Sequence, residues 1–198
     1  MSPAWLFPAL KREPDQLLQL TRRQIDTVCA RMERSSLAGS LWFNLAAELL
    51  QTPALFDALL SDCLLRMPPA LRGRVVLEVS EDALAGQLVA ARVARLRQAG
   101  YLVAMDDFGA GYSNLGRLLT GGFDILKLDL ALLRQVPERI WAANAYREVV
   151  NLAAASGALV VAEGVERQCQ SDFVRWAGVD IIQGFLYARP QPLAAGLP

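Results

Sequence analysis

The sequence predicts an α/β fold built on a parallel sheet, and three observations support this prediction. Apolar residues make up 54% of the 198 residues, which is enough for a large core. Six short apolar runs alternate with helix-like segments, as expected of repeated strand–helix units. The runs contain consecutive apolar residues, which is typical of parallel strands covered on both faces. An open doubly wound sheet and a barrel both fit this pattern, although six units do not close an eight-stranded barrel.

The expected elements follow in chain order, and local residues support their ends. Strands are expected at residues 40–45, 74–80, 101–107, 124–130, 158–164 and 179–185. Helices are expected at residues 14–34, 53–66, 84–99, 112–120, 138–156 and 167–177. Residues common at helix starts support three of the helices: Pro14, Thr52 and Ser113. Glycines that readily end a helix precede three of the strands: Gly100, Gly157 and Gly178.

The composition excludes several classes of protein. Lys plus Arg equals Asp plus Glu at 20 each, which argues against a general nucleic-acid binder. The sequence has no histidine, so His-based catalytic triads and His-ligated zinc sites are excluded. We find no apolar run long enough to span a membrane and no signal peptide, and the three cysteines lack metal-ligand spacing. We therefore expect a cytoplasmic protein whose chemistry uses carboxylates, lysine, amides or water.

Polar residues stand at the C-terminal end of every expected strand. They are Asn44, Glu78, Asp106 with Asp107, Lys127 with Asp129, Glu163, and Gln183. A separate cap or turn explains any one of them, but not their presence at all six strand ends. In a parallel barrel these ends open on one face, which is where active sites lie.

Carboxylates gathered on one face repel each other, so they need a cation or protons. Oxygen ligands without His or Cys suit magnesium, manganese or calcium. Two such metals about 4 Å apart are suited to phosphodiester cleavage. Asp106 and Asp107 would then serve neighbouring metals, and Lys127 would add positive charge near a phosphate or hold the attacking water. A plain turn after a strand is the simpler interpretation of Gly109 and Gly111, because a short G-A-G stretch is a weak phosphate-loop signal.

Several motifs are spread along nearly the whole chain. They are S-P-A-W-L-F-P (2–8), W-F-N-L (42–45), V-L-E-V-S-E-D-A-L (76–84), M-D-D-F-G-A-G-Y-S-N-L (105–115), I-L-K-L-D (125–129), V-V-A-E-G-V-E (160–166) and Q-G-F-L-Y-A-R-P (183–190). In this order and combination they resemble the motifs of the EAL domain family of cyclic-di-GMP phosphodiesterases, including its D-D-F-G-T-G-Y-S-S-L loop and its A-E-G-V-E segment. The resemblance implies a modified TIM-type (β/α) barrel.

The resemblance also implies roles for individual residues. The implied metal ligands for Mg²⁺ or Mn²⁺ are Asn44, Glu78, Asp106, Asp107 and Glu163. Lys127 and Glu163 are the implied catalytic residues, acting on water or charge. The implied substrate-binding or loop residues are Gly109, Gly111, Tyr112, Asp129, Glu166 and Gln183. The segment from Gly109 to Tyr112 would be a mobile loop that couples metal occupancy to dimerisation.

The sequence also departs from the family pattern. The Glu of the E-A-L motif, a metal ligand in the family, belongs to a strand before S-P-x-x-F-I-P, and here Ser2 directly follows Met1. The string from Glu81 to Leu84 is no substitute, because it stands where the family has E-S-x-L. Residues 130–132 read L-A-L where the family has R-S-F. We therefore expect residues 1–198 to form a single EAL-type domain that is incomplete at its N-terminus, lacks the first strands and has weakened metal binding.

Three functions remain open at this point. The first is a degenerate module that binds cyclic-di-GMP or regulates a partner, with little or no hydrolysis. The second is a metal-dependent phosphodiesterase that cleaves cyclic-di-GMP to the linear dinucleotide. The third is a protein-interaction module that binds no nucleotide, which the retained acidic residues and Lys127 argue against. We expect a homodimer or a protein partner, with residues 2–10 covering one sheet edge, and we expect no membrane or nucleic-acid binding.

Overall fold

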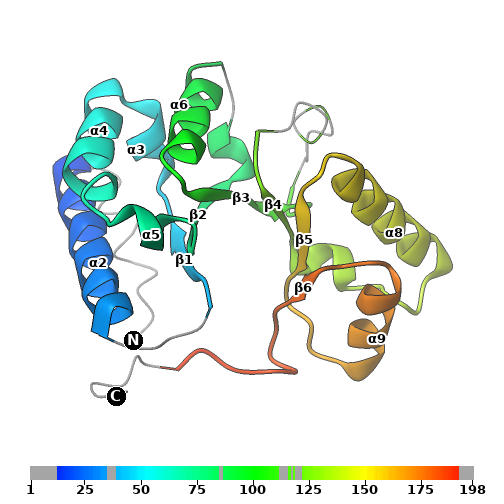
Figure 1. The fold of residues 1–198 in the computed structure, drawn as a ribbon. Coiled ribbons are helices and arrows are strands. Elements are labelled where there is room, and N and C mark those ends of the chain that lie inside the picture. Colours follow the sequence, from blue (N-terminus) through cyan, green and yellow to red (C-terminus); the bar gives the residue numbers. More distant parts are fainter. Residues whose placement is uncertain are drawn as a thin grey trace. The chain divides into compact units, whose positions relative to one another are not determined.

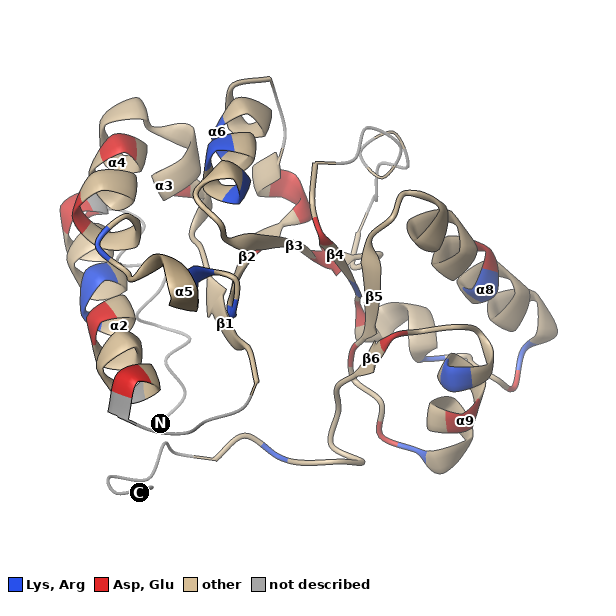
Figure 2. Cartoon of the chain, in the orientation of Figure 1, with Lys and Arg blue, Asp and Glu red and all other residues tan. Residues whose placement is uncertain are grey.

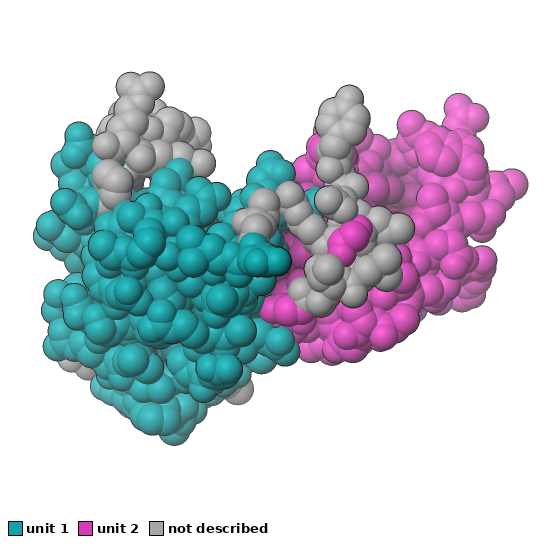
Figure 3. All heavy atoms as spheres, turned by 90° about the horizontal axis from the view of Figure 1, so that it is seen from above, with its two compact units in different colours: residues 1–103 teal, residues 104–198 magenta. Residues whose placement is uncertain are grey.

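The computed structural model of the chain describes residues 13–34, 39–84, 87–111, 116, 118 and 122–191. The chain divides into two compact units, residues 1–103 and 104–198 (Figure 3). Strand β3 (Leu102–Phe108) begins in the first unit and ends in the second. The six strands follow each other in the sheet in chain order, from β1 to β6 (Figure 1). The assignment of residues 1–198 to a single domain stays a prediction.

The first unit packs helices of different lengths against two parallel strands. Its elements are α2 (Pro14–Arg34), β1 (Leu41–Asn44), α3 (Ala47–Gln51), α4 (Pro53–Ala58), the π-helix η2 (Leu59–Leu64), α5 (Pro69–Arg72), β2 (Val75–Ser80), the 3₁₀-helix η3 (Glu81–Leu84) and α6 (Gln87–Gln98). Helix α2 buries Leu17, Ile25 and Met32, which are about two helical turns apart and so lie on one face of the helix. These side chains join a core that includes fully buried Phe56 and Leu96.

The second unit contains the end of β3 and three further strands, of which β4 is the most deeply buried. After β3 come β4 (Ile125–Leu128), the 3₁₀-helix η4 (Leu130–Leu133), α8 (Ile140–Ala155), β5 (Leu159–Ala162), α9 (Gln168–Trp176) and β6 (Ile181–Ile182). All four residues of β4 are buried, as expected of a strand covered on both faces. Helix α8 contacts β5, and its buried Tyr146 meets Phe173 of α9 edge to face at 5.8 Å between ring centroids.

Backbone hydrogen bonds extend the ladder just beyond the strand ends. The Asp129 amide donates to the Phe108 carbonyl at 3.0 Å, and the Glu163 amide donates to the Leu128 carbonyl at 3.1 Å. The Gln183 amide donates to the Ala162 carbonyl at 2.8 Å. Because the strands are parallel, these bonds place the residues that follow β4, β5 and β6 at one edge of the second unit's sheet.

Most of the expected elements are present among the described residues, with shifted ends and some additions. The helix expected at 53–66 divides into α4 and the π-helix η2, and the strand expected at 179–185 is only Ile181–Ile182. The helix expected at 112–120 and the covering segment 2–10 lie largely or wholly outside the described residues. Among the helices that the structure describes, none is long and apolar enough to cross a bilayer.

Candidate functional site

A β-bulge explains how the carboxylates of Asp106 and Asp107 come to lie close together. Neighbouring residues of a regular strand point to opposite faces. Met105 pairs with Leu126 and Phe108 pairs with Leu128, so two residues of β3 stand opposite one residue of β4. Asp107 has a φ of 60°, in the left-handed region that Asp tolerates better than most residues. The bulge redirects a side chain, as bulges beside functional sites commonly do.

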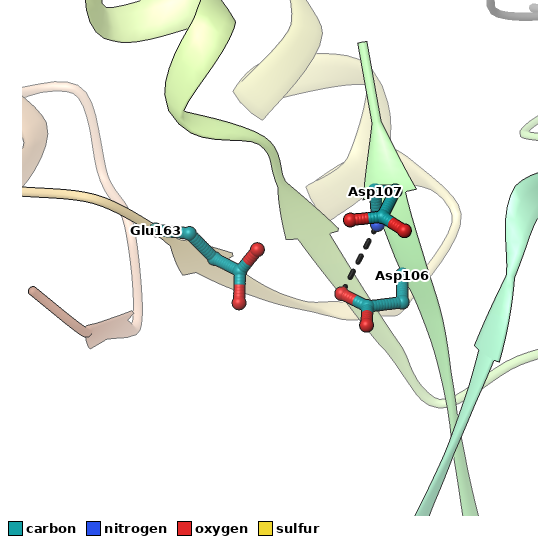
Figure 4. Close-up of side chains that lie close together, drawn as sticks. All are labelled: Asp106, Asp107 and Glu163. Atoms are coloured by element: carbon teal, nitrogen blue, oxygen red, sulfur yellow. Dashed lines mark hydrogen bonds between the residues drawn. The ribbon is translucent and has the colours of Figure 1, made fainter. Parts of the chain in front are cut away.

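The bulge brings the carboxylates of Asp106 and Asp107 close to the carboxylate of Glu163, the residue that follows β5. One carboxylate oxygen each of Asp106, Asp107 and Glu163 lies within 4.8 Å of the others (Figure 4). The Asp107 amide also donates to Asp106 Oδ1 at 3.0 Å, which fixes the first carboxylate against the bulge. Three residues from β3 and from the end of β5, the strands on either side of β4, therefore form one acidic cluster, which we define as Asp106, Asp107 and Glu163.

Lys127 holds the acidic cluster together. It lies on β4, between the two strands that carry the carboxylates, and its side chain is only 5% exposed. Its Nζ lies 2.7 Å from Asp106 Oδ1 and 2.8 Å from Glu163 Oε1. A buried ammonium needs such partners, because an unpaired buried charge is costly. Three ionised carboxylates and one ammonium sum to a formal charge of −2.

The electrostatics of the cluster favour a cation. Partial burial raises the pKa of the Asp107 carboxyl, and the neighbouring carboxylates Asp106 and Asp129 raise it further, while Lys127 opposes them. Acidic residues are visible at the end of β3 and after β5 in Figure 2. The donors are all carboxylate oxygens, which match the preference of Mg²⁺, Mn²⁺ or Ca²⁺. The residues present therefore fit the divalent metal that the sequence predicts.

The other predicted site residues have varied surroundings. In the first unit, Asn44 at the end of β1 pairs in register with Glu78 within β2, and Glu78 is buried while Asn44 is exposed. In the second unit, Asp129 accepts a hydrogen bond from the Ala131 amide at 2.8 Å and so caps η4. Glu166 and Gln183 are exposed. Their roles as ligands or substrate contacts stay predictions.

The glycines of the loop after β3 are only partly described. Gly109 has a φ of +96°, which favours glycine, and Gly111 ends this stretch of described residues. Tyr112 lies outside the described residues.

A buried glutamine that was not among the predicted site residues, Gln170, fixes the loop after Glu163. Gln170 Oε1 accepts hydrogen bonds from the Glu166 and Arg167 amides, both at 3.1 Å. Its Nε2 donates to the Leu133 carbonyl at 3.1 Å. Arg167 directly precedes α9, and Gln170 stands three residues later. A glutamine at this spacing is typical of a helix-capping motif, so the sequence could have indicated the role of Gln170.

Comparison with known proteins places the chain in a family. The EAL domain family model matches residues 1–190. The probable cyclic di-GMP phosphodiesterase PdeA of Escherichia coli (strain K12) is 36% identical over 122 residues, which are 61% of this chain and 17% of PdeA. The chain thus spans less than a fifth of that relative's length.

Two solved structures are also similar. The PaMucR phosphodiesterase in complex with c-di-GMP has a TM-score of 0.81 at 26% identity, over 98% of this chain and 79% of that one. Klebsiella pneumoniae BlrP1 in a manganese/cy-diGMP complex has a TM-score of 0.66 at 32% identity, over 76% of this chain and 39% of that one.

The chain belongs to the EAL domain family. The likeness to PaMucR confirms the predicted fold class, an α/β fold of the modified TIM-type barrel. It also decides between the two architectures that apolar periodicity left open, in favour of the barrel type over the open doubly wound sheet.

Proposed function

We propose that the chain binds cyclic-di-GMP together with Mg²⁺ or Mn²⁺ and cleaves one phosphodiester bond to give the linear dinucleotide. The observation that carries this proposal is the acidic cluster, in which three carboxylates lie within 4.8 Å of one another beside a buried lysine. The similarity to PdeA and to the manganese/cy-diGMP complex of BlrP1 supports the choice of nucleotide and metal.

The acidic cluster would hold the metal, and Lys127 would organise it. A bound divalent metal supplies polarisation of a phosphate oxygen and a more acidic water molecule. Lys127 keeps Asp106 and Glu163 at fixed positions through two short ion pairs, so little reorganisation is needed. Its ammonium also adds positive charge close to where a phosphate would bind. The roles of Asn44 and Glu78 as further ligands stay predictions.

A hydrolysis assay with a matched pair of variants tests the proposal. Glu163→Gln removes one charge from the acidic cluster, and we expect the magnesium-dependent formation of linear dinucleotide to fall by roughly 100-fold or more. Glu148→Gln makes the same chemical change at an exposed position of α8, where Glu148 pairs with Arg147, and should leave the rate unchanged. Equal rates for wild type and Glu163→Gln would refute a role for the cluster in cleavage.

A second candidate function is a nucleotide-binding or regulatory module with little or no hydrolysis. It is favoured by the two ion pairs of Lys127, which already offset part of the negative charge that would attract a metal. Binding of cyclic-di-GMP with turnover at background level would identify this function. Absence of nucleotide binding, with or without metal, would instead leave the third function, a protein-interaction module.

We also propose that the domain associates with a second copy of itself. The second unit exposes large apolar side chains on its helices, among them Ile140, Trp141 and Trp176. Exposed apolar groups of this size are typical of surfaces that contact another protein. Light scattering that finds only monomer at micromolar and higher concentrations would refute self-association.

A further inference from the structure

We infer that two leucines of η4, Leu130 and Leu132, act as positioning residues for the acidic cluster. The inference rests on the proposed function, because it concerns the geometry of the same metal site. Neither the sequence of η4 nor its place after β4 indicates such a role. We call Leu130 and Leu132 the leucine pair.

The first contact joins the leucine pair to the loop after β3. A Cβ placed on Gly109 would lie 2.6 Å from Leu132 Cγ and Cδ1 and 2.9 Å from Cδ2. Real Cβ atoms do not approach so closely, so the isobutyl group of Leu132 lies directly against the Gly109 backbone. Gly109 is two residues beyond Asp107, and the Ala110 amide donates to the Asp107 carbonyl at 3.1 Å. The contact therefore supports the turn that follows the bulge.

The second contact joins the leucine pair to the loop after β5. A Cβ on Gly164 would overlap Leu130 Cβ and lie 3.4 Å from Leu130 Cα. Gly164 has a φ of +65° and directly follows Glu163 in the chain. The backbone that carries the third carboxylate of the cluster therefore packs against Leu130.

The helix that carries the leucine pair is itself fixed beside Lys127. Asp129 caps η4 through the Ala131 amide, and the Asp129 amide is bonded to the Phe108 carbonyl. One rigid turn thus contacts both backbone segments that present carboxylates to Lys127. Loosening either contact would let Asp107 or Glu163 shift, and shifts in the partners that orient metal ligands commonly weaken metal affinity.

The leucine pair is suited to a test because its members contribute little to the core. Leu130 is 46% exposed and Leu132 is half-buried, whereas their neighbour Leu133 is buried. Alanine at position 130 would keep the Cβ that contacts Gly164, so glycine is the substitution that removes this contact. Leu65 in the first unit is 47% exposed and matches Leu130 in side chain and exposure. Leu130→Gly and Leu132→Ala, and the controls Leu65→Gly and Leu65→Ala, should all fold.

The experiment titrates Mn²⁺ into the metal-free wild type and these four variants by calorimetry. We expect Leu130→Gly and Leu132→Ala to bind Mn²⁺ about tenfold more weakly than wild type, and both Leu65 variants to bind as wild type does. Affinities of the leucine-pair variants equal to those of the matching Leu65 variants would overturn the inference.

Amide hydrogen exchange on the metal-free proteins provides a second measurement that does not depend on metal. Exchange in residues 104–111 should be faster in Leu132→Ala, exchange in residues 159–166 should be faster in Leu130→Gly, and both should be unchanged in the Leu65 variants. If wild type binds no Mn²⁺, the metal part of the proposed function fails and the exchange data alone decide the inference. Unchanged exchange in both segments would then overturn it.

Discussion

At the scale of single residues, the adjacent pair of aspartates depends on a departure from regular strand geometry. The D-D-F-G sequence indicated that both carboxylates serve one site, but a regular strand would separate them. The one-residue bulge opposite Lys127 and the positive φ of Asp107 resolve this conflict. Sequence could predict the residue types but not the bulge, because a bulge is set by pairing with β4 and leaves no periodic pattern.

Lys127 should contribute strongly to the stability of the metal-free protein. Lys127→Met keeps the length of the side chain but leaves Asp106 and Glu163 without their cationic partner. We expect a loss of roughly 3 kcal/mol in the free energy of unfolding, at the low end for buried pairs because both carboxylates still reach water. Urea unfolding without metal measures this loss. Added Mg²⁺ should recover part of it, and a variant as stable as wild type would contradict the role of the ion pairs.

Alanine at Gly109 should destabilise the protein more than alanine at Gly157, whose φ is also positive. Gly109→Ala places a methyl group against Leu132 at a φ of +96°, whereas Gly157→Ala meets no atom within 4 Å at a φ of +81°. The backbone strain alone costs about 1–2 kcal/mol, and overpacking adds roughly 1–3 kcal/mol for Gly109→Ala. Thermal or urea unfolding of both variants measures the two losses of stability. Equal losses would show that Leu132 moves aside without cost and would contradict the expected overpacking.

At the scale of elements, sequence periodicity predicts the strands well and the short helices poorly. The runs at 74–80 and 124–130 correspond to β2 and β4, because buried strands need several consecutive apolar residues. The 3₁₀-helix η4 was not predicted, since four residues are too few to show a helical period. The π-helix η2 reads as a continuation of α4, because the i→i+5 pattern is not visible in a short apolar sequence.

The start of α9 should depend on Gln170. Gln170→Met keeps the side-chain length but cannot accept the hydrogen bonds from the Glu166 and Arg167 amides. Because these amides lose a buried partner, we expect a loss of about 1–3 kcal/mol in the free energy of unfolding. Gln168→Met on the same helix is the control, since the Gln168 side chain donates to the exposed Asp172. Chemical denaturation that finds the two variants equally stable would contradict this capping role.

At the scale of the whole molecule, the alternation of apolar runs and helix-like segments predicted the α/β fold, and the resemblance of several motifs to the EAL pattern predicted the family. The absence of histidine limited the site to oxygen ligands and lysine, and the acidic cluster with Lys127 agrees with that limit. Spacing along the chain could not predict which of the predicted residues contact each other. The ion pairs of Lys127 depend on β4 lying between β3 and β5.

We propose that the acidic cluster binds a divalent metal and that this metal strengthens the binding of cyclic-di-GMP. A calorimetric titration of cyclic-di-GMP into the purified chain, with Mg²⁺ and then with excess chelator, tests both parts of this proposal. We expect binding with Mg²⁺, at least about tenfold weaker binding with chelator, and the same weakening in Asp106→Asn with Mg²⁺. Equal affinity in all three cases, or no binding in any of them, would contradict it.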